Sequence, residues 1–483
     1  MYKIGFGRVD ITPTESMPLS GMGINSKRMS RVVRDELYAT CIAVTDEADT
    51  TVLLFTLDLI QSSGHVLTIR PQIAAVTGVP EEHIFLSATH THAGPDVGNK
   101  DWDSAARYRE VLPGMLCAAA EQAMADRSEA KLYMGDVEAE RMNFVKHYKY
   151  LDENGKEQYF GDNYGVGTIN ETTRHMTEAD PTIHILKITR DGKKDVILCN
   201  WRAHPHSTSG SKTYDLSADF IADYRDFMEK EGVLFAYFQG ACGNLNNKSR
   251  ITEEEITRNC RAFGRVMAQY TKKGLENMKE VSCGPIQTKR FILTLPVNKP
   301  TDEMLKAVDA VRACWQQTMD FHKSTALGAE FNIRSPYHAN SLYHRYHGLP
   351  ETENSELNAV AFGEELAFIT APNELFDTLT MYVEDHAPYQ KVLMFGYCNG
   401  YTGYIPSAYG FEYTSYETDC CHFNPGCGEI YRDTFLEMLG FGPAEACISI
   451  DGLPYCLTSD AATRGSAKRI RTPAPTRSAS SSV

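Results

Sequence analysis

Two histidines one residue apart, His90 and His92, stand in the segment SATHTHAGPD (87–96), directly after the apolar run 84–86. Imidazole is a common metal ligand and titrates near neutral pH, so such a pair can bind a metal or move protons. In an extended chain, residues i and i+2 point to the same face about 6.5–7 Å apart. The Gly-Pro that follows predicts a turn, which leaves the pair at a strand end. Taken alone, the pair is also compatible with two surface histidines on a loop.

Three further segments carry polar groups soon after a short apolar strand. NWRAHPH (200–206) contains His204 before a proline, where extended structure is favoured. Glu374 follows the predicted strand 366–370, and Tyr404 lies in NGYTGY, after the predicted strand 391–396. Taken singly, these are compatible with a core histidine, a first-turn helix carboxylate and a turn-covering tyrosine.

The shared position after a strand is what connects these segments. Strand ends meet at one edge of a sheet, so the four groups can surround one ion. Nitrogen and oxygen ligands in about four positions are what a catalytic zinc requires. The sequence lacks HExxH, GxSxG, Walker A and GxGxxG motifs, and the Cys/His cluster at 420–427 fits no closed zinc module. The sequence therefore predicts one Zn²⁺ per chain.

Apolar strands and helical stretches alternate along the chain. This rhythm predicts an α/β fold: a mixed β-sheet core packed by helices on its faces, with the metal site at strand ends. The expected strands are 37–44, 51–60, 84–87, 182–189, 195–201, 235–239, 366–370 and 391–396, and the expected helices are 66–76, 104–127, 253–278, 300–318 and 375–383. We expect a single domain over 1–460. The basic, Ser/Ala-rich segment 461–483 cannot bury a core, so we expect a disordered tail.

Composition restricts the class of protein further. The 483 residues carry a formal net charge of −15, which argues against a nucleic-acid partner. No apolar run is long enough to predict a transmembrane segment, and the N-terminus resembles a first strand rather than a signal peptide. Thirteen cysteines without a repeated CxxC pattern indicate a reducing compartment, so we expect a cytoplasmic protein. The sequence does not specify an oligomeric state.

In this order, the segments resemble the N-terminal catalytic domain of the neutral/alkaline non-lysosomal ceramidase family. The resemblance spans about residues 4–435 and rests on GFGRVDITP, TLDLI, SATHTHAGP, NWRAHPHS, LSADF, QGACGNLN, APNEL and NGYTGYIP. It implies a mononuclear zinc hydrolase of lipid metabolism that acts on linear C–N bonds. Metal-activated water would split an N-acyl amide such as ceramide.

The resemblance also implies roles for single residues. The zinc ligands are expected to be His90, His204, Glu374 and Tyr404. His92 is expected near the metal in proton transfer, and Tyr404 is also expected to act in catalysis.

Three flanking residues have weaker expected roles. Asn244 and Asn246 are candidates for substrate binding. Asp58, in TLDLI, is a candidate for holding a histidine ring from outside the metal site, and a strand-end cap is its alternative role.

The chain departs from the family in ways that bear on the substrate. Asn246 stands where the family has a serine, Asn143–Phe144 stands where it has Asn-Arg, and we expect no C-terminal immunoglobulin-like domain. The substrate can therefore be ceramide, a small N-acyl compound, an ester or a lactone. Two other classes stay open. One is a non-catalytic metal-binding relative, and the other is a TIM-barrel amidohydrolase, whose HxH normally lies on its first strand.

Overall fold

The computed structural model describes residues 1–22, 28–161, 169–208, 213–251, 259–413 and 415–440, together with the backbone of 448–450 and 453–455. The tail expected over 461–483 lies outside these residues. The boundaries of the expected single domain stay a prediction.

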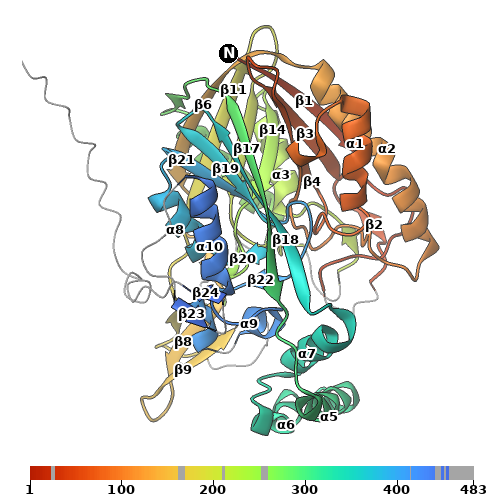
Figure 1. Cartoon of the computed structure of the whole chain (residues 1–483), viewed down its shortest axis with the longest axis vertical. Helices are drawn as coiled ribbons and strands as arrows, with labels where there is room; N and C mark the ends of the chain where they lie inside the picture. The colour runs from red at the N-terminus through yellow and green to blue at the C-terminus, as the bar shows by residue number, and fades with distance from the viewer. Residues whose placement is uncertain are drawn as a thin grey trace, which may run out of the picture.

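A nine-stranded mixed sheet forms one half of the core (Figure 1). Its outer pairs, β12–β14 and β4–β5, are parallel, and its inner pairs are antiparallel. Thr56 of β4 donates to the carbonyl of Tyr237 in β14 at 2.6 Å, so the sheet curls until its two ends come together. In spatial order the strands are β14 (Leu234–Gln239), β12 (Val196–Trp201), β11 (Thr182–Arg190), β6 (Ser128–Glu138), β1 (Tyr2–Asp10), β3 (Tyr38–Thr45), β4 (Thr51–Leu57) and β5 (Ile84–Ala88), with β16 (Lys279–Glu280) beside β6.

A second, four-stranded sheet packs face to face against the first. Its strands are β17 (Ile286–Pro296), β18 (Thr352–Phe362), β19 (Leu366–Thr370) and β21 (Lys391–Phe395). One buried apolar layer takes side chains from both sheets, and within it the rings of Phe238 and Phe395 stack at 4.2 Å. The core is therefore a pair of sheets. The sequence pattern does not distinguish this arrangement from one sheet with helices on both faces. A strand with both faces buried has the same run of apolar residues in either case.

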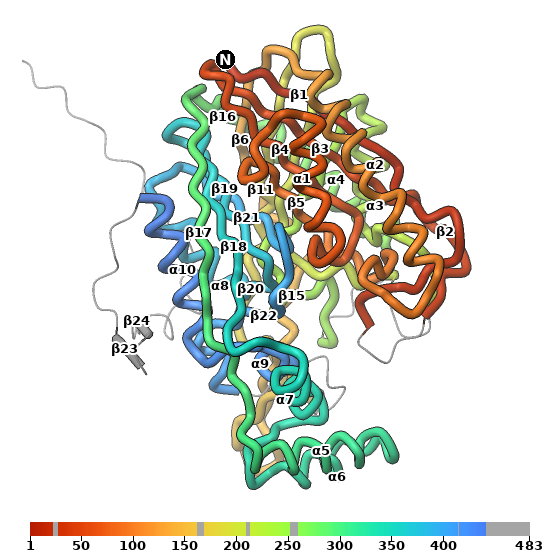
Figure 2. The backbone as a smooth tube through the Cα atoms, turned by 45° about the vertical axis from the view of Figure 1, so that its right-hand side comes forward, coloured from red at the N-terminus to blue at the C-terminus, as the bar shows by residue number. Residues whose placement is uncertain are grey.

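Helices cover the outer faces of both sheets, which makes four layers (Figures 1 and 2). The large sheet carries α1 (Arg70–Thr77), α2 (Asp103–Ala125), α3 (Phe220–Glu229) and α4 (Cys260–Gly274), and the small sheet carries α8 (Asp377–His386) and α10 (Cys427–Met438). The predicted α/β class is confirmed. The antiparallel pairs among the described strands exclude a TIM barrel.

Two glycines of the first motif let α2 lie against β1. A Cβ added at Gly5 or Gly7 would come within 1.9 and 2.1 Å of the carbonyl oxygens of Ala123 and Ala119. The small residues of GFG and of the Ala-rich helix thus allow close contact between the two backbones.

A helical lobe is inserted between β17 and β18 and projects from the body of the molecule (Figure 2). It contains α5 (Asp302–Thr318), α6 (Phe321–Ala326) and α7 (Pro336–Gly348). Asp419 of α9 (Tyr416–Cys420) ties the lobe to the body, because it pairs with Arg334 at 2.8 Å and accepts from the Ser335 hydroxyl at 2.5 Å. The helix predicted over 300–318 is confirmed as α5.

Short ladders complete the fold. They are β2 (Val32–Val33) with β13 (Asp215–Leu216), β7 (Phe144–Val145) with β15 (Leu245–Asn246), β8 (His147–Leu151) with β9 (Glu157–Gly161) and β10 (Arg174–His175), β20 (Glu374–Leu375) with β22 (Tyr404–Ile405), and β23 (Ile448–Ile450) with β24 (Leu453–Tyr455).

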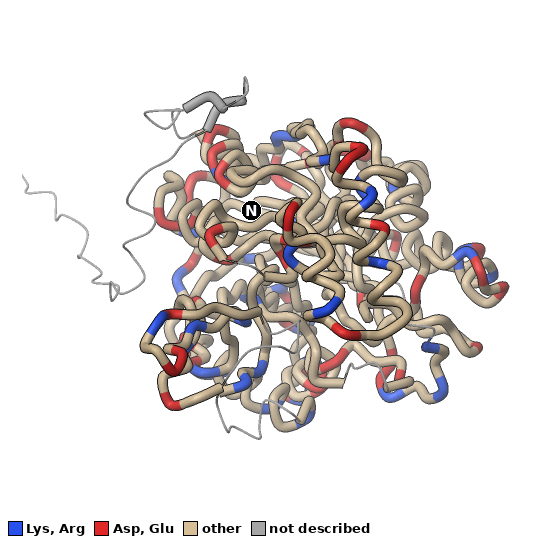
Figure 3. The backbone as a smooth tube through the Cα atoms, turned by 90° about the horizontal axis from the view of Figure 1, so that it is seen from below, with Lys and Arg blue, Asp and Glu red and all other residues tan. Residues whose placement is uncertain are grey.

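Charged residues are interspersed over the surface. In Figure 3, acidic and basic positions are intermixed along the backbone and are not gathered by sign. No helix within the described residues is both long and apolar enough to cross a bilayer.

Candidate metal centre

Strand ends from both sheets converge on one buried point, as the sequence pattern predicted. His90 follows β5 and His204 follows β12, both in the large sheet. Glu374 opens β20 after β19 of the small sheet, and the parallel pairing of β20 with β22 sets Tyr404 beside it.

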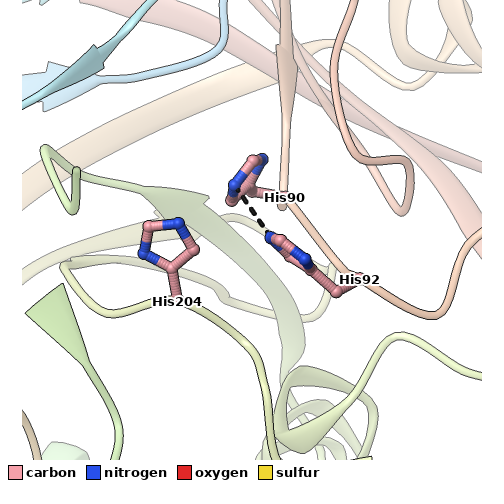
Figure 4. Close-up of side chains that lie close together, drawn as sticks. All are labelled: His90, His92 and His204. Atoms are coloured by element: carbon pink, nitrogen blue, oxygen red, sulfur yellow. Dashed lines mark hydrogen bonds between the residues drawn. The ribbon is translucent and has the colours of Figure 1, made fainter. Parts of the chain in front are cut away.

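The three histidines lie close together (Figure 4), and Glu374 faces two of them. Nε2 of His90 is 3.1 Å from Nε2 of His92. Oε2 of Glu374 is 3.0 Å from Nε2 of His204 and 3.5 Å from Nε2 of His90. All four side chains are at least nine-tenths buried. His92 therefore belongs to the same group of potential ligands, and a role confined to proton transfer stays a prediction.

The other ring nitrogen of each histidine is fixed by the backbone. Every Nδ1 faces a carbonyl oxygen, which can only accept a hydrogen bond, so each Nδ1 carries the proton. The carbonyls are those of Ile60, Gly21 and Leu245, at 2.7, 2.7 and 2.9 Å from His90, His92 and His204 respectively. Each Nε2 thus directs a lone pair into the cluster, the arrangement typical of metal-bound histidines.

This donor set fits a zinc ion. Three imidazole lone pairs and one carboxylate face one another, and a cation between them removes their mutual repulsion. Two tetrahedral ligands about 2.0–2.1 Å from zinc lie about 3.3–3.4 Å apart, close to the 3.0 and 3.5 Å from Glu374 to His204 and His90.

The protonation states agree with metal binding, which needs neutral imidazole and an ionised carboxylate. Burial lowers the pKa of His204 to about 4, assisted by the charge of Lys146, although Glu374 opposes this shift. Burial and the neighbouring histidines hold the pKa of His92 well below its usual range. Burial alone would raise the pKa of Glu374, but His90 and His204 keep it well below its ordinary value.

The backbone at His90 differs from the extended segment that the sequence suggested. His90 has φ of 63°, in the left-handed region that few non-glycine residues adopt. Its N–H donates to the carbonyl of Leu59 at 3.0 Å, so the chain turns alongside residues 57–60 after β5. The two histidines therefore converge through a turn rather than through strand alternation, and backbone strain at such a position is typical of functional sites.

The loop between β21 and β22 supplies two tyrosines, Tyr397 and Tyr401, for which the sequence predicts no role. The ring of Tyr397 stacks on His90 with centroids 3.8 Å apart. The hydroxyl of Tyr401 donates to Oε1 of Glu374 at 2.6 Å. Tyr404, the predicted ligand, is buried beside Glu374 in the β20–β22 ladder. The sequence contains a tyrosine-rich motif, but the spacing of its residues does not predict which ring contacts which metal ligand.

Asp58 was predicted either to hold a histidine ring or to cap a strand end, and its described contacts are of the second kind. Its Oδ2 accepts from Nη2 of Arg225 at 2.7 Å and from the backbone N–H of Tyr38 at 2.9 Å. The ring of His90 is held instead by the carbonyl of Ile60, two residues further along the same TLDLI segment. This acceptor is a backbone carbonyl, which every residue carries, so the sequence does not indicate the contact.

The two asparagines of the segment GACGNLN (240–246) have different structural partners. Asn244 exchanges two hydrogen bonds with Asp377 at the start of α8, at 2.8 and 3.0 Å, so its amide fixes the loop to that helix. Asn246 lies in β15 and forms a backbone bridge with His204. Substrate binding by either side chain stays a prediction.

Two glycines make room for the cluster. A Cβ at Gly21, where φ is +90°, would lie 2.6 Å from Nδ1 of His92. A Cβ at Gly243 would lie 2.4 Å from the carbonyl oxygen of Glu374. Only glycine allows these close approaches.

A second group of residues with metal-ligand chemistry lies away from this cluster. Asp180, His184 and Glu384 come close together, but Arg202 pairs with Glu384 at 2.7 Å and with Asp180 at 3.5 Å. A cationic side chain of the protein already neutralises these carboxylates, so this group is an ion-pair network.

Solved structures similar to this one include ceramidases. Neutral ceramidase from Pseudomonas aeruginosa matches with a TM-score of 0.66 at 17% identity, over 91% of this chain and 74% of that one. The chain has the fold of a neutral ceramidase. A ceramidase complexed with C2 matches with a TM-score of 0.64 at 16% identity, over the same shares of the two chains. No protein-family model and no curated protein sequence matches significantly.

Proposed function

We propose that this protein is a zinc-dependent hydrolase of N-acyl amide bonds, with one zinc ion held by His90, His204, Glu374 and Tyr404. The observation that carries the proposal is the buried set of imidazole and carboxylate lone pairs directed at one point. The ceramidase fold supports it, because solved proteins of that fold are named for cleaving an amide.

A bound zinc ion would supply Lewis acidity and a water that ionises near neutral pH. The chain's own contribution to proton transfer is His92. Its Nδ1–H is tied to the carbonyl of Gly21 at 2.7 Å, so Nε2 is the atom that can take a proton and later give it to the leaving nitrogen. Its lowered pKa keeps Nε2 unprotonated at pH 7.

Tyr404 is the weakest of the four proposed ligands, because burial and the charge of Glu374 raise its pKa well above the usual range and so disfavour the phenolate. A Tyr404 hydroxyl that leaves the metal would be a hydrogen-bond donor for a developing oxyanion.

The substrate proposal is an N-acyl compound, lipid or small, rather than ceramide in particular. We place the enzyme in the cytoplasm, since the cysteines of the described residues are free thiols. Hydrolysis of esters or lactones by the same site is the second candidate.

The test is hydrolysis by the purified, zinc-loaded chain of a panel containing N-acyl amides of short and long acyl chain, matched esters and a lactone. We expect amide cleavage that a chelator abolishes and zinc restores. Preference for the esters or the lactone would replace the amide proposal by the second candidate. No cleavage of any member by a protein that holds stoichiometric zinc would favour a non-catalytic relative.

A further inference from the structure

The two oxygens of Glu374 have different partners. Oε2 faces Nε2 of His204 and of His90. Oε1 accepts the hydroxyl of Tyr401 at 2.6 Å, a length typical of a strong O–H···O⁻ bond. One oxygen is thus directed at the cluster and the other is tied away from it.

Tyr401 is held on the same backbone scaffold as Glu374. The segment 398–403 is connected to 371–374 by three backbone hydrogen bonds, from Cys398 to Ala371 at 2.9 Å, from Thr402 to Pro372 at 2.9 Å and from Glu374 to Gly403 at 3.0 Å. The relative position of Tyr401 and Glu374 is therefore set by the two chain segments and does not depend on a ligand.

From this geometry we propose that Tyr401 is a positioning residue that keeps Glu374 a single-oxygen ligand, so that one coordination position of the metal stays open to water and substrate. The inference rests on the proposed function and explains how the metal keeps a position for water and substrate. A catalytic zinc site needs such an exchangeable position, which beside the four proposed protein ligands is a fifth one. A carboxylate free to rotate can bind through both oxygens and fill it.

The direction of the hydrogen bond follows from the chemistry of the two groups. An ionised carboxylate can only accept, so the hydroxyl of Tyr401 donates to Oε1 of Glu374. Tyr401→Phe removes this donor and keeps the ring.

The experiment replaces zinc by Co²⁺, whose visible absorption bands weaken as the coordination number rises. We expect the wild-type chain and Tyr401→Phe each to bind one Co²⁺, with weaker bands in the variant. Amide hydrolysis should fall about 10–100-fold, as for other partners that orient metal ligands. Circular dichroism confirms that the variant is folded.

Tyr397→Phe is the matched control. It also removes a hydroxyl from this loop, next to His90, but that hydroxyl contacts Sγ of Cys242 at 3.0 Å and not Glu374. Its cobalt spectrum should equal that of the wild type. Equal band intensities for Tyr401→Phe and wild type would overturn the inference while leaving the metal centre intact. Failure of the wild type to bind Co²⁺ or Zn²⁺ would overturn the proposed function and the inference with it.

Discussion

His92 is oriented by a glycine that lies 71 positions earlier in the chain. The carbonyl of Gly21 accepts its Nδ1–H, and the missing side chain of Gly21 makes room for the ring. A single backbone contact therefore determines that Nε2 of His92, and not Nδ1, faces the cluster. Sequence patterns do not predict such a contact, because it depends on the meeting of two distant loops.

Gly21→Ala tests this contact. The added Cβ would displace the ring, so we expect amide hydrolysis to fall at least about 100-fold, the lower range for a lost acid–base group. Zinc content should be unchanged, because His90, His204 and Glu374 do not contact Gly21 among the described contacts. The control is Gly64→Ala, which also has a positive φ of 57° but no neighbour within 4 Å of the added Cβ. Equal activity of the two variants would contradict the account.

The strands explain why the predicted metal ligands could be recognised from the sequence. Each ligand motif follows a strand of apolar residues, and the strands after which His90, His204 and Glu374 lie were all expected at nearly the observed positions. The motif residues then mark where those strand ends meet. The layer of the second sheet was not predictable in this way, because the apolar runs of β19 and β21 do not specify which surface covers them.

The site residues for which the sequence predicts no role lie in loops. Asn399 shows the reason: its amide accepts from the N–H of Leu86 at 2.8 Å and donates to the carbonyl of Ile84 at 3.2 Å, which fixes the 397–404 loop against β5. It has φ of 57°. The motif around it was recognised, but the partner of each side chain follows from the three-dimensional path of the loop.

At the scale of the whole molecule, an ion-pair network joins the two sheets. His184 of β11 lies between Asp136 of β6, at 2.7 Å, and Glu384 of α8, at 3.7 Å. Lys391 of β21 also pairs with Asp136, and Arg202 pairs with Glu384 at 2.7 Å. Burial alone would lower the pKa of His184, but the two carboxylates together raise it.

This network makes stability depend on pH. Because the folded pKa of His184 lies above its unfolded value near 6.5, its contribution is fully present below about pH 6.5 and is lost as the pH rises through the folded pKa. We expect His184→Gln to lower the free energy of unfolding most near pH 6 and least near pH 9, measured by urea denaturation. His322→Gln, at an exposed histidine of the lobe, is the control. A loss that does not change with pH would contradict this role.

The central claim is a zinc centre built where the two sheets meet, and zinc content tests it most directly. The measurement is equilibrium dialysis against zinc followed by elemental analysis of the wild type, His90→Ala, His204→Ala and the control His322→Ala. We predict one zinc per chain in the wild type and the control, and loss of stoichiometric zinc in both other variants, with circular dichroism confirming that all are folded. Stoichiometric zinc retained by folded His90→Ala and His204→Ala, or a wild type that binds none, would contradict the account.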